Sequence, residues 1–182
     1  MVILVDADGV LENHTHVWIE MLNEKYGRTV KYEEVTDWDM GKAYPGLTRE
    51  QIYEIELDDR MYDLMQPLEG AKECLEKLLE KGNDVFVVTS TPYQAIKSKL
   101  EKVLFRYYPF LSWKDIIVTS NKKLIKGDVL IDDGVHNLLK GDYKKILVST
   151  PYNESFDADA NDIIRTRNWK EIEVALDKMG AL

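Results

Sequence analysis

The sequence is poor in cysteine, in long apolar runs and in positive charge, and each shortage excludes a class of protein. Cys74 is the single cysteine among 182 residues, so an internal disulfide is impossible and a reducing cytoplasm is the expected compartment. No apolar run approaches the roughly 20 residues that cross a bilayer, so we expect no membrane contact of that kind. The first residues lack a basic leader and a cleavage site, and we expect no signal peptide there.

Negative charge dominates the chain, which argues against a nucleic acid polymer as partner. Asp and Glu number 33 against 24 Lys and Arg, giving a formal net charge of -9. Broad contact with a DNA or RNA backbone needs clustered Lys and Arg, because the phosphates dominate such binding. A small anion held by a metal ion and one lysine stays compatible with this charge. The length of 182 residues fits one domain, or one domain with an insertion. The oligomeric state is left open, a homodimer included.

Apolar segments without alternation predict a parallel sheet whose strands are buried on both faces. Each segment is short and mostly β-branched, which is typical of such strands. The five segments are 2–5, 84–88, 115–119, 128–131 and 145–149. Helical patterns alternate with them at 70–82, 92–108 and 168–179. This alternation predicts an α/β fold with a doubly wound, mainly parallel, Rossmann-like sheet.

Residues 14–69 interrupt the alternation, because they contain no buried-strand segment. Their pattern is mostly helical, and Thr48 and Gln51 have the spacing of a helix-capping box. We therefore expect a small helical cap inserted after the first strand, over residues 14–69. Residues 1–13 and 70–182 would form the core, with the cap over the carboxyl edge of the sheet.

Polar side chains follow four of the predicted strands, at the edge where ligands of open α/β sheets bind. They are Asp6 and Asp8 after the first strand, Thr89, Ser90 and Thr91 after the second, Asn121, Lys122 and Lys123 after the third, and Asp132 and Asp133 after the fourth. Carboxylates suit Mg²⁺, which leaves coordination positions for water and phosphate oxygens. Hydroxyls and a lysine nearby suit a phosphoryl group, and two carboxylates in unlike environments can act as nucleophile and proton carrier.

Each of these motifs alone also has an ordinary structural explanation. Paired aspartates after a strand are common in turns, the hydroxyls of 89–91 can cap a helix before Pro92, and a single lysine is mostly solvated surface. Their joint occurrence, each after a predicted strand, favours a functional site. The sequence therefore predicts a Mg²⁺ site that binds a small phosphate monoester.

The order of the motifs resembles the haloacid dehalogenase (HAD) superfamily of phosphohydrolases. Its four motifs match DADGV at 6–10, VTS at 88–90, Lys122 and LIDD at 130–133. Within the superfamily the chain is similar to the 5′(3′)-deoxyribonucleotidase branch, through D-x-D-G-V-L, the spacing in NKKLIKGDVLIDD, and the small cap before PLEGA. The resemblance covers nearly the whole chain and implies the sheet order 3-2-1-4-5.

The resemblance also implies how the matching residues act on a phosphate ester. Asp6 is the nucleophile and forms an aspartyl-phosphate. Asp8 protonates the leaving alcohol and then activates the water that hydrolyses the intermediate. Thr89 and the Ser90 amide bind the phosphate, and Lys122 neutralises it together with the charge of Asp6.

A metal site is implied in the same way. Mg²⁺ is held by the Asp6 side chain, the Asp8 backbone carbonyl and Asp133. Asp132 supports the site, either as a second ligand or as the partner of Lys122. Which of the two adjacent aspartates is the main ligand stays open at this point.

Substrate selection is expected from the cap, because caps of deoxyribonucleotidases carry aromatic residues that sandwich the base. Trp38 and Tyr44 are the candidates, and packing of Trp38 between cap and core is the alternative. Base stacking is worth about 1–3 kcal/mol, so such a tryptophan would favour nucleotides over sugar phosphates. His14 stands where the family commonly has an aromatic residue of the base pocket, and it is a poor candidate for a Mg²⁺ ligand because Mg²⁺ prefers oxygen.

The expected activity is Mg²⁺-dependent hydrolysis of (deoxy)ribonucleoside monophosphates to nucleoside and phosphate. Two alternatives stay open, a HAD phosphatase for another small phosphate ester and a catalytically silent nucleotide-binding protein. Asp8 argues against dehalogenation, which has no leaving alcohol to protonate. Base, sugar and 5′ versus 3′ preference are not decided by the sequence.

Overall fold

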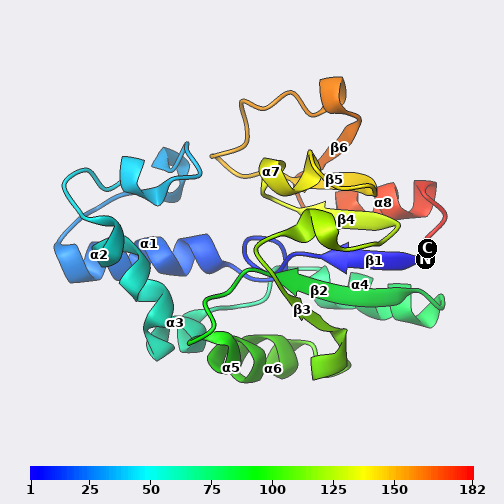
Figure 1. Ribbon diagram of the computed structural model, residues 1–182, viewed down its shortest axis with the longest axis horizontal. Helices are drawn as coiled ribbons and strands as arrows, with labels where there is room; N and C mark the ends of the chain where they lie inside the picture. The colour runs from blue at the N-terminus through cyan, green and yellow to red at the C-terminus, as the bar shows by residue number, and fades with distance from the viewer.

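Six parallel strands form a single sheet in the computed structural model, which describes residues 1–182 (Figure 1). The strands are β1 (Val2–Val5), β2 (Asp84–Thr89), β3 (Ile116–Val118), β4 (Val129–Asp132), β5 (Lys144–Val148) and β6 (Ile163–Thr166). Their spatial order is β3-β2-β1-β4-β5-β6, and every neighbouring pair is parallel. The expected order 3-2-1-4-5 is confirmed, with a sixth strand added beside β5.

β1 lies between β2 and β4, so the carboxyl ends of all three strands meet. Val5, its last residue, is in register with Val87 of β2 and Ile131 of β4. All three side chains are fully buried. A strand covered on both faces needs apolar residues at every position, which explains why these segments do not alternate. Polar residues begin at Asp6, where the chain leaves the sheet.

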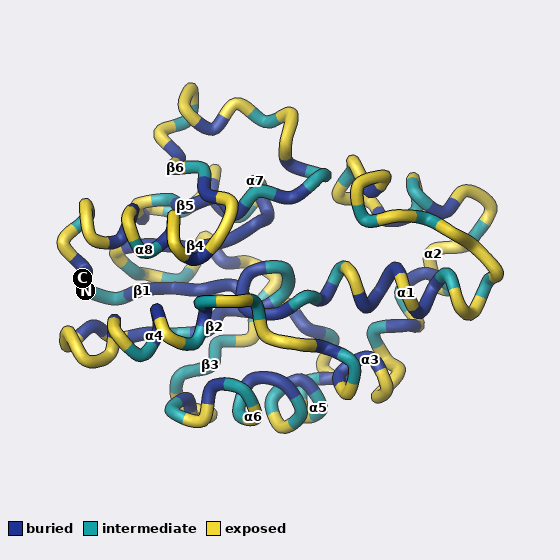
Figure 2. The backbone as a smooth tube through the Cα atoms, turned by 180° about the vertical axis from the view of Figure 1, so that it is seen from behind, coloured by how far each residue is buried: buried dark blue, intermediate teal, exposed yellow.

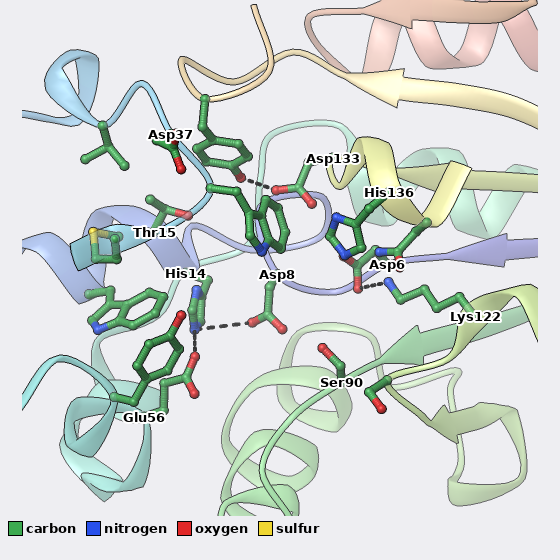
Figure 3. Close-up of a pocket in the computed structure, with 18 of the residues that line it drawn as sticks. Asp6, Asp8, His14, Thr15, Asp37, Glu56, Ser90, Lys122, Asp133 and His136 are labelled. Carbon is green, nitrogen blue, oxygen red and sulfur yellow. Dashed lines mark hydrogen bonds and ion pairs between the residues drawn. The ribbon is translucent and has the colours of Figure 1, made fainter. Parts of the chain in front are cut away.

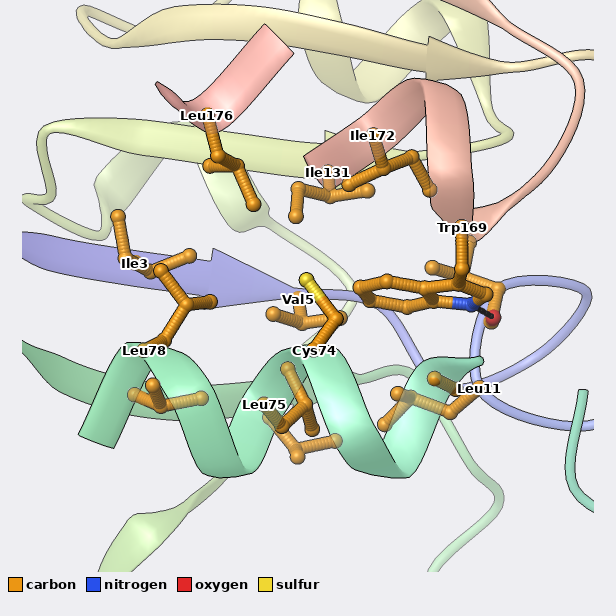
Figure 4. Close-up of a cluster of buried hydrophobic side chains, with 14 of the residues drawn as sticks. Ile3, Val5, Leu11, Cys74, Leu75, Leu78, Ile131, Trp169, Ile172 and Leu176 are labelled. Carbon is orange, nitrogen blue, oxygen red and sulfur yellow. Dashed lines mark hydrogen bonds between the residues drawn. The ribbon is translucent and has the colours of Figure 1, made fainter. Parts of the chain in front are cut away.

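Helices cover both faces of the sheet. α4 (Ala71–Glu80) and α8 (Trp169–Lys178) pack on one face, against side chains that include Ile3 (Figure 4). α7 (Val135–Leu138) contributes to the apolar cluster on the other face. Cys74 is a buried core residue of α4, as the helical pattern predicts. Burial of one large apolar side chain stabilises the fold by about 1.5–3 kcal/mol, so the helices on the two faces stabilise the sheet.

A helical segment follows β1, in the stretch for which we expect a cap. Its helices are α1 (His14–Tyr26), α2 (Arg49–Tyr53) and α3 (Asp59–Leu64), with short 3₁₀ turns among them. Their buried apolar side chains form a third cluster, which also includes Ala95 and Val103 from the helical region after β2. The predicted capping box is confirmed, because the N–H of Gln51 donates to Thr48 Oγ1 at 3.3 Å. Figure 2 shows this layer beyond the carboxyl end of β1, with many exposed residues along its outer loops.

Two elements differ from the sequence prediction. β6 was not expected, because it is an edge strand of four residues with only partial burial and gives little pattern. The helix expected over 92–108 begins later and consists of α5 (Ile96–Lys99), a π-helical segment (Leu100–Leu104) and α6 (Phe105–Tyr107). None of the helices combines the length and hydropathy that a membrane crossing requires.

Candidate active site

The chain turns sharply after β1 and brings two aspartates to the carboxyl edge of the sheet. The N–H of Asp6 donates to the Ile131 carbonyl at 2.9 Å, which extends the pairing with β4 by one residue. Gly9 has a φ of +74°, and a Cβ there would lie 2.5 Å from Asp133 Oδ2. Glycine is therefore needed both for the turn and for the close approach. Asp6 and Asp8 line the same cavity (Figure 3).

Asp6 is held by a buried lysine and a second carboxylate. Lys122 is 4% exposed, and its Nζ lies 2.7 Å from Asp6 Oδ1 and 2.7 Å from Asp132 Oδ2. Asp132 also accepts from the N–H of Gly134 at 2.7 Å and from Asn137 Nδ2 at 3.1 Å. Both oxygens of Asp132 thus have protein donors, and Asp132 orients Lys122 toward Asp6.

Burial raises the pKa of Asp6 to about 7, although Lys122 opposes the shift. Burial also acts on Lys122, lowering its pKa, but Asp6 and Asp132 outweigh this and raise the pKa above the usual lysine value. Lys122 is therefore a permanent cation. A second positive charge next to Asp6 would favour its ionised, nucleophilic form.

The acidic cluster offers a site for such a charge. Oxygen atoms of Asp6, Asp132 and Asp133 lie within 4.8 Å of one another. Asp133 Oδ1 is buried without a hydrogen-bond partner, while the Tyr152 hydroxyl donates to Oδ2. Burial raises the pKa of Asp133 well above its usual value, and the neighbouring carboxylates add to the shift. An unpartnered buried carboxylate oxygen beside other carboxylates is costly, so these residues fit a divalent metal ion.

Asp8 has a separate set of partners. Lys99, 2% exposed, forms an ion pair with Asp8 Oδ1, and its Nζ lies 3.3 Å from Glu12 Oε1. Thr89 Oγ1 donates to Asp8 Oδ2 at 3.4 Å, and His14 Nε2 lies 3.6 Å from Asp8 Oδ1. Burial alone would raise the pKa of Asp8, but Lys99 and His14 bring it below the usual range. The two aspartates of the D-x-D motif therefore have pKa values shifted in opposite directions.

The residues predicted from the strand ends converge on one cavity of about 300 Å³. Those that line it are Asp6, Asp8, Ser90, Lys122 and Asp133. Thr89 is buried behind Ser90, and its hydroxyl lies 2.9 Å from the Thr91 hydroxyl as well as near Asp8. Carboxylates, hydroxyls and one permanent cation thus surround a space large enough for a phosphate ester.

The cavity continues from the strand ends to the cap. His14 lines it and is 8% exposed, with Nε2 3.8 Å from Glu56 Oε1. Burial lowers the pKa of His14 to about 4, so its ring is neutral near pH 7. Trp38 also lines the cavity, is 55% exposed, and meets the rings of His136 and Tyr152 edge-on at 4.8 and 5.3 Å between centroids.

Tyr44 does not line this cavity, in contrast to the sequence prediction. Its side chain is 1% exposed and packs in the apolar cluster of the cap. Its hydroxyl donates to the Ile19 carbonyl at 3.2 Å, which satisfies the polar end of a buried tyrosine. The structure places Tyr44 in the cap interior, because the spacing of cap aromatics does not say which side each one faces.

Sequence reasoning missed several polar residues in and beside the site, among them Lys99, Glu12 and Tyr152. The sequence pattern around Lys99 could have indicated its burial. Ala95 and Val103 lie four residues before and after it, and both are apolar and buried. The pattern around Glu12 is a weaker indication, because it shows only an acidic residue directly after the apolar pair Val10 and Leu11. Tyr152 follows β5, the fifth predicted strand, by four residues.

Comparison with known proteins gives a family match over nearly the entire chain. The family described as 5′ nucleotidase, deoxy (pyrimidine), cytosolic type C matches residues 1–179. A 5′(3′)-deoxyribonucleotidase of Bacillus subtilis (strain 168) is 33% identical over 173 residues, covering 94% of this chain and 96% of that protein. A 5′(3′)-deoxyribonucleotidase of Clostridium acetobutylicum is 26% identical over 175 residues, covering 96% of this chain and 94% of that protein.

Solved structures share the fold at lower identity. A HAD family hydrolase from Deinococcus radiodurans with bound phosphate and sodium superposes with a TM-score of 0.68 at 16% identity, covering 100% of this chain and 96% of that one. A predicted phosphatase from Clostridium acetobutylicum gives a TM-score of 0.68 at 16% identity, covering 97% and 98%. At such identities the likeness shows a HAD-type fold.

Proposed function

We propose that this chain, which belongs to the family of 5′ nucleotidase, deoxy (pyrimidine), cytosolic type C proteins, hydrolyses (deoxy)ribonucleoside monophosphates with Mg²⁺ and through an aspartyl-phosphate on Asp6. As a member of this family it is a phosphoric monoester hydrolase of the HAD type. The observation that carries the proposal is the pair Asp6 and Asp8, which share a cavity but have opposite pKa shifts. Two carboxylates in unlike environments can divide nucleophilic attack and proton transfer between them.

The oxygen donors support Mg²⁺ as the metal. The Asp6 and Asp133 side chains and the Asp8 carbonyl would hold it, since Mg²⁺ uses few carboxylates and keeps positions for water and phosphate. Asp132 is the partner of Lys122 in this assignment, because both of its oxygens already accept from protein donors. When bound, Mg²⁺ supplies positive charge that reduces the repulsion between Asp6 and a phosphate dianion.

In the first half-reaction an ionised oxygen of Asp6 attacks phosphorus. The bond from phosphorus to the nucleoside oxygen breaks as the bond to Asp6 forms, and Asp8 gives its proton to the leaving oxygen. Lys122, Thr89 and the Ser90 amide bind the phosphoryl oxygens, because this chemistry depends on positioning and charge neutralisation. Arrival of the phosphate dianion beside Asp8 raises the pKa of that carboxyl, which allows it to carry the proton despite Lys99.

In the second half-reaction water attacks the phosphorus of the aspartyl-phosphate. Asp8, now ionised, takes the proton from this water, and the bond between Asp6 and phosphorus breaks. Inorganic phosphate leaves, and both aspartates return to their starting states. The two half-reactions together convert one phosphate ester and one water molecule to one nucleoside and one inorganic phosphate.

We infer that residues 14–69 form a specificity cap on a core of residues 1–13 and 70–182. His14 and Trp38 reach the cavity from the cap, while the phosphate-binding groups reach it from the strand ends. The exposed Trp38 ring can stack on a base, which is worth about 1–3 kcal/mol. The names of the two bacterial relatives support a nucleotide as substrate.

A substrate panel tests this function. Purified protein with Mg²⁺ is assayed for phosphate release from deoxyribonucleoside 5′- and 3′-monophosphates, ribonucleoside monophosphates, sugar phosphates and an aryl phosphate. We expect nucleotides to have the highest kcat/KM and chelation to abolish turnover. Equal kcat/KM across nucleotides and sugar phosphates would instead assign the site to other small phosphate esters. Absence of hydrolysis with nucleotide still bound would mean a silent binding protein.

A further inference from the structure

We propose that Lys99, anchored by the buried Glu12, is a positioning residue that fixes Oδ1 of Asp8 and leaves Oδ2 as the oxygen that exchanges the proton with the substrate. The proposal rests on the proposed function, in which Asp8 transfers protons. It assigns a role to two charged residues that lie behind the cavity and do not line it.

Lys99 is placed where a charge is costly. Its side chain is 2% exposed and extends from the end of α5, from a helix face that Ala95 and Val103 otherwise make apolar. A buried ammonium requires carboxylate partners, because water no longer solvates it. Lys99 has two such partners, Asp8, which lines the cavity, and Glu12, which does not. The π-helical segment that starts at the next residue adds an extra residue to the turn, a feature frequent at functional sites.

Glu12 contacts this lysine from the interior of the protein, where burial raises the pKa of its carboxyl group well above the usual value although Lys99 opposes the shift. It is 0% exposed, neither carboxylate oxygen has a hydrogen-bond partner, and its one ion pair is with Lys99. The N–H of Gly9 donates to the Glu12 carbonyl at 3.0 Å and closes the loop that contains both acids. The short loop after β1 therefore delivers Asp8 and Glu12 together to a single ammonium group.

The two oxygens of Asp8 are made unequal by this arrangement. Oδ1 is bound by Lys99, with His14 Nε2 at 3.6 Å, whereas Oδ2 has only the Thr89 hydroxyl at 3.4 Å. Because Thr89 is one of the groups proposed to bind the phosphate, Oδ2 faces the side from which a phosphoryl group would approach. A carboxylate fixed at one oxygen cannot rotate toward Lys122, the other buried ammonium in the site. Positioned proton transfer contributes about 10²–10⁴-fold to rate, and a misplacement of about 1 Å can cost about 10²-fold.

The test compares two leaving groups in Lys99→Met. A nucleoside leaving group needs the proton from Asp8, so kcat for a nucleoside monophosphate should fall about 100-fold or more. Dinitrophenolate needs no proton to leave, so 2,4-dinitrophenyl phosphate should still phosphorylate Asp6. Dephosphorylation, which needs Asp8 as a base, should then be slow, and rapid-mixing experiments should show a burst of one dinitrophenolate per enzyme. Lys102→Met is the matched control, because Lys102 pairs with Asp59 and Asp63 outside the cavity.

A second variant separates positioning from folding. Lys99→Met leaves the buried Glu12 and the partly exposed Asp8 without their lysine, whereas the double variant Lys99→Met/Glu12→Gln also replaces the buried carboxyl group by an amide. The double variant should fold, as judged by its thermal unfolding, and give the same burst. Wild-type kcat on the nucleotide in either variant, or an equal loss on both substrates without a burst, would overturn the role of Lys99. Failure of the wild-type protein to hydrolyse any phosphate monoester would overturn the proposed function as well.

Discussion

Asp6 and Asp8 share a cavity, and the same device holds each of them. A lysine at most 4% exposed lies against each aspartate, Lys122 against Asp6 and Lys99 against Asp8. Each lysine also contacts a second carboxylate that is 0% exposed. The duplication places one permanent positive charge on each side of the space where a phosphate would bind.

The second carboxylates differ in their other partners. Asp132, beside Lys122, also accepts from the N–H of Gly134 and from Asn137. Glu12, beside Lys99, accepts no hydrogen bond at all. Asp132 would keep its other donors if its lysine were lost, whereas Glu12 would remain as a buried carboxyl group without a donor. Asp6, Lys122 and Asp132 (the Asp6 half of the site) are therefore held by several backbone and side-chain donors, whereas Asp8, Lys99 and Glu12 (the Asp8 half) depend mainly on the two ion pairs of Lys99.

The largest expected effect is on the nucleophile. Asp6→Asn replaces an attacking carboxylate by an amide of the same shape, so hydrolysis of an aryl phosphate should fall by about 10⁴-fold or more. Phosphate release in the presence of Mg²⁺ measures it. Asp84→Asn is the control, because Asp84 is an exposed acid at the opposite end of the sheet. Retention of a tenth of wild-type activity in Asp6→Asn would exclude Asp6 as nucleophile.

Removal of the lysines should separate the two halves. Lys122→Met should reduce kcat/KM about 10²–10³-fold, as loss of one charge-stabilising donor usually does. Its free energy of unfolding should fall less than that of Lys99→Met, for which breaking a buried pair predicts a loss of about 3–5 kcal/mol. Urea unfolding of both variants at pH 7 gives the comparison. Equal losses of stability would mean that the hydrogen bonds to Asp132 do not compensate for its lysine.

The Asp6 half was predictable from the sequence because all of its groups follow strand ends. Parallel strands end at one edge of a sheet, so position along the chain implies proximity in space for Asp6, Lys122 and Asp133. The order of the five predicted strands was predictable in a different way, through the family resemblance. β6 was not, since an edge strand is only partly buried and its pattern is weak.

The Asp8 half was not predictable, because its geometry depends on packing that no short pattern encodes. Lys99 reaches Asp8 because α5 packs beside the loop that follows β1. The helical periodicity also changes directly after Lys99, where the π-helical segment begins. Glu12 is buried by the closure of that loop. Tyr44 shows the same limit in the cap, where an aromatic residue can face the cavity or the apolar cluster at identical spacing.

Metal binding should depend strongly on pH. Burial raises the pKa of Asp6 from 3.8 to about 7, so the folded, metal-free protein binds this proton more tightly than the unfolded chain. The resulting stability is present at low pH and lost as pH rises through 7. Mg²⁺ must displace the proton, so its affinity should increase about 10-fold per pH unit between roughly 5.5 and 7.

Titration calorimetry and thermal unfolding both measure this linkage. Without Mg²⁺ the midpoint of unfolding should be lower at pH 8 than at pH 5.5, and Mg²⁺ should raise it more at pH 8. Asp6→Asn should reduce the pH dependence, while Asp84→Asn should leave it intact. An equal rise in the midpoint with Mg²⁺ at both pH values would show that the metal does not compete with these protons.

The smallest expected effect lies in the cap, at Trp38. Trp38→Ala removes a stacking surface but no charged group, so KM for nucleoside monophosphates should rise about 10-fold, within the range of one base stack. Its kcat and the kinetics with a small aryl phosphate should change little, because the groups that we propose bind the phosphate come from the strand ends. Trp113→Ala is a matched control, since Trp113 is 72% exposed and lies outside the cavity.

The contacts of Trp38 with His136 and Tyr152 provide the competing explanation. If Trp38 instead holds the cap against the core, its loss should loosen the cavity for every substrate, and nucleotide and aryl phosphate kinetics should worsen together. His136→Ala distinguishes the cases, because it removes the core side of one ring contact and leaves the Trp38 ring for stacking. A selective rise in KM in Trp38→Ala but not in His136→Ala assigns Trp38 to the base, whereas equal effects of both variants on all substrates assign it to packing of the cap.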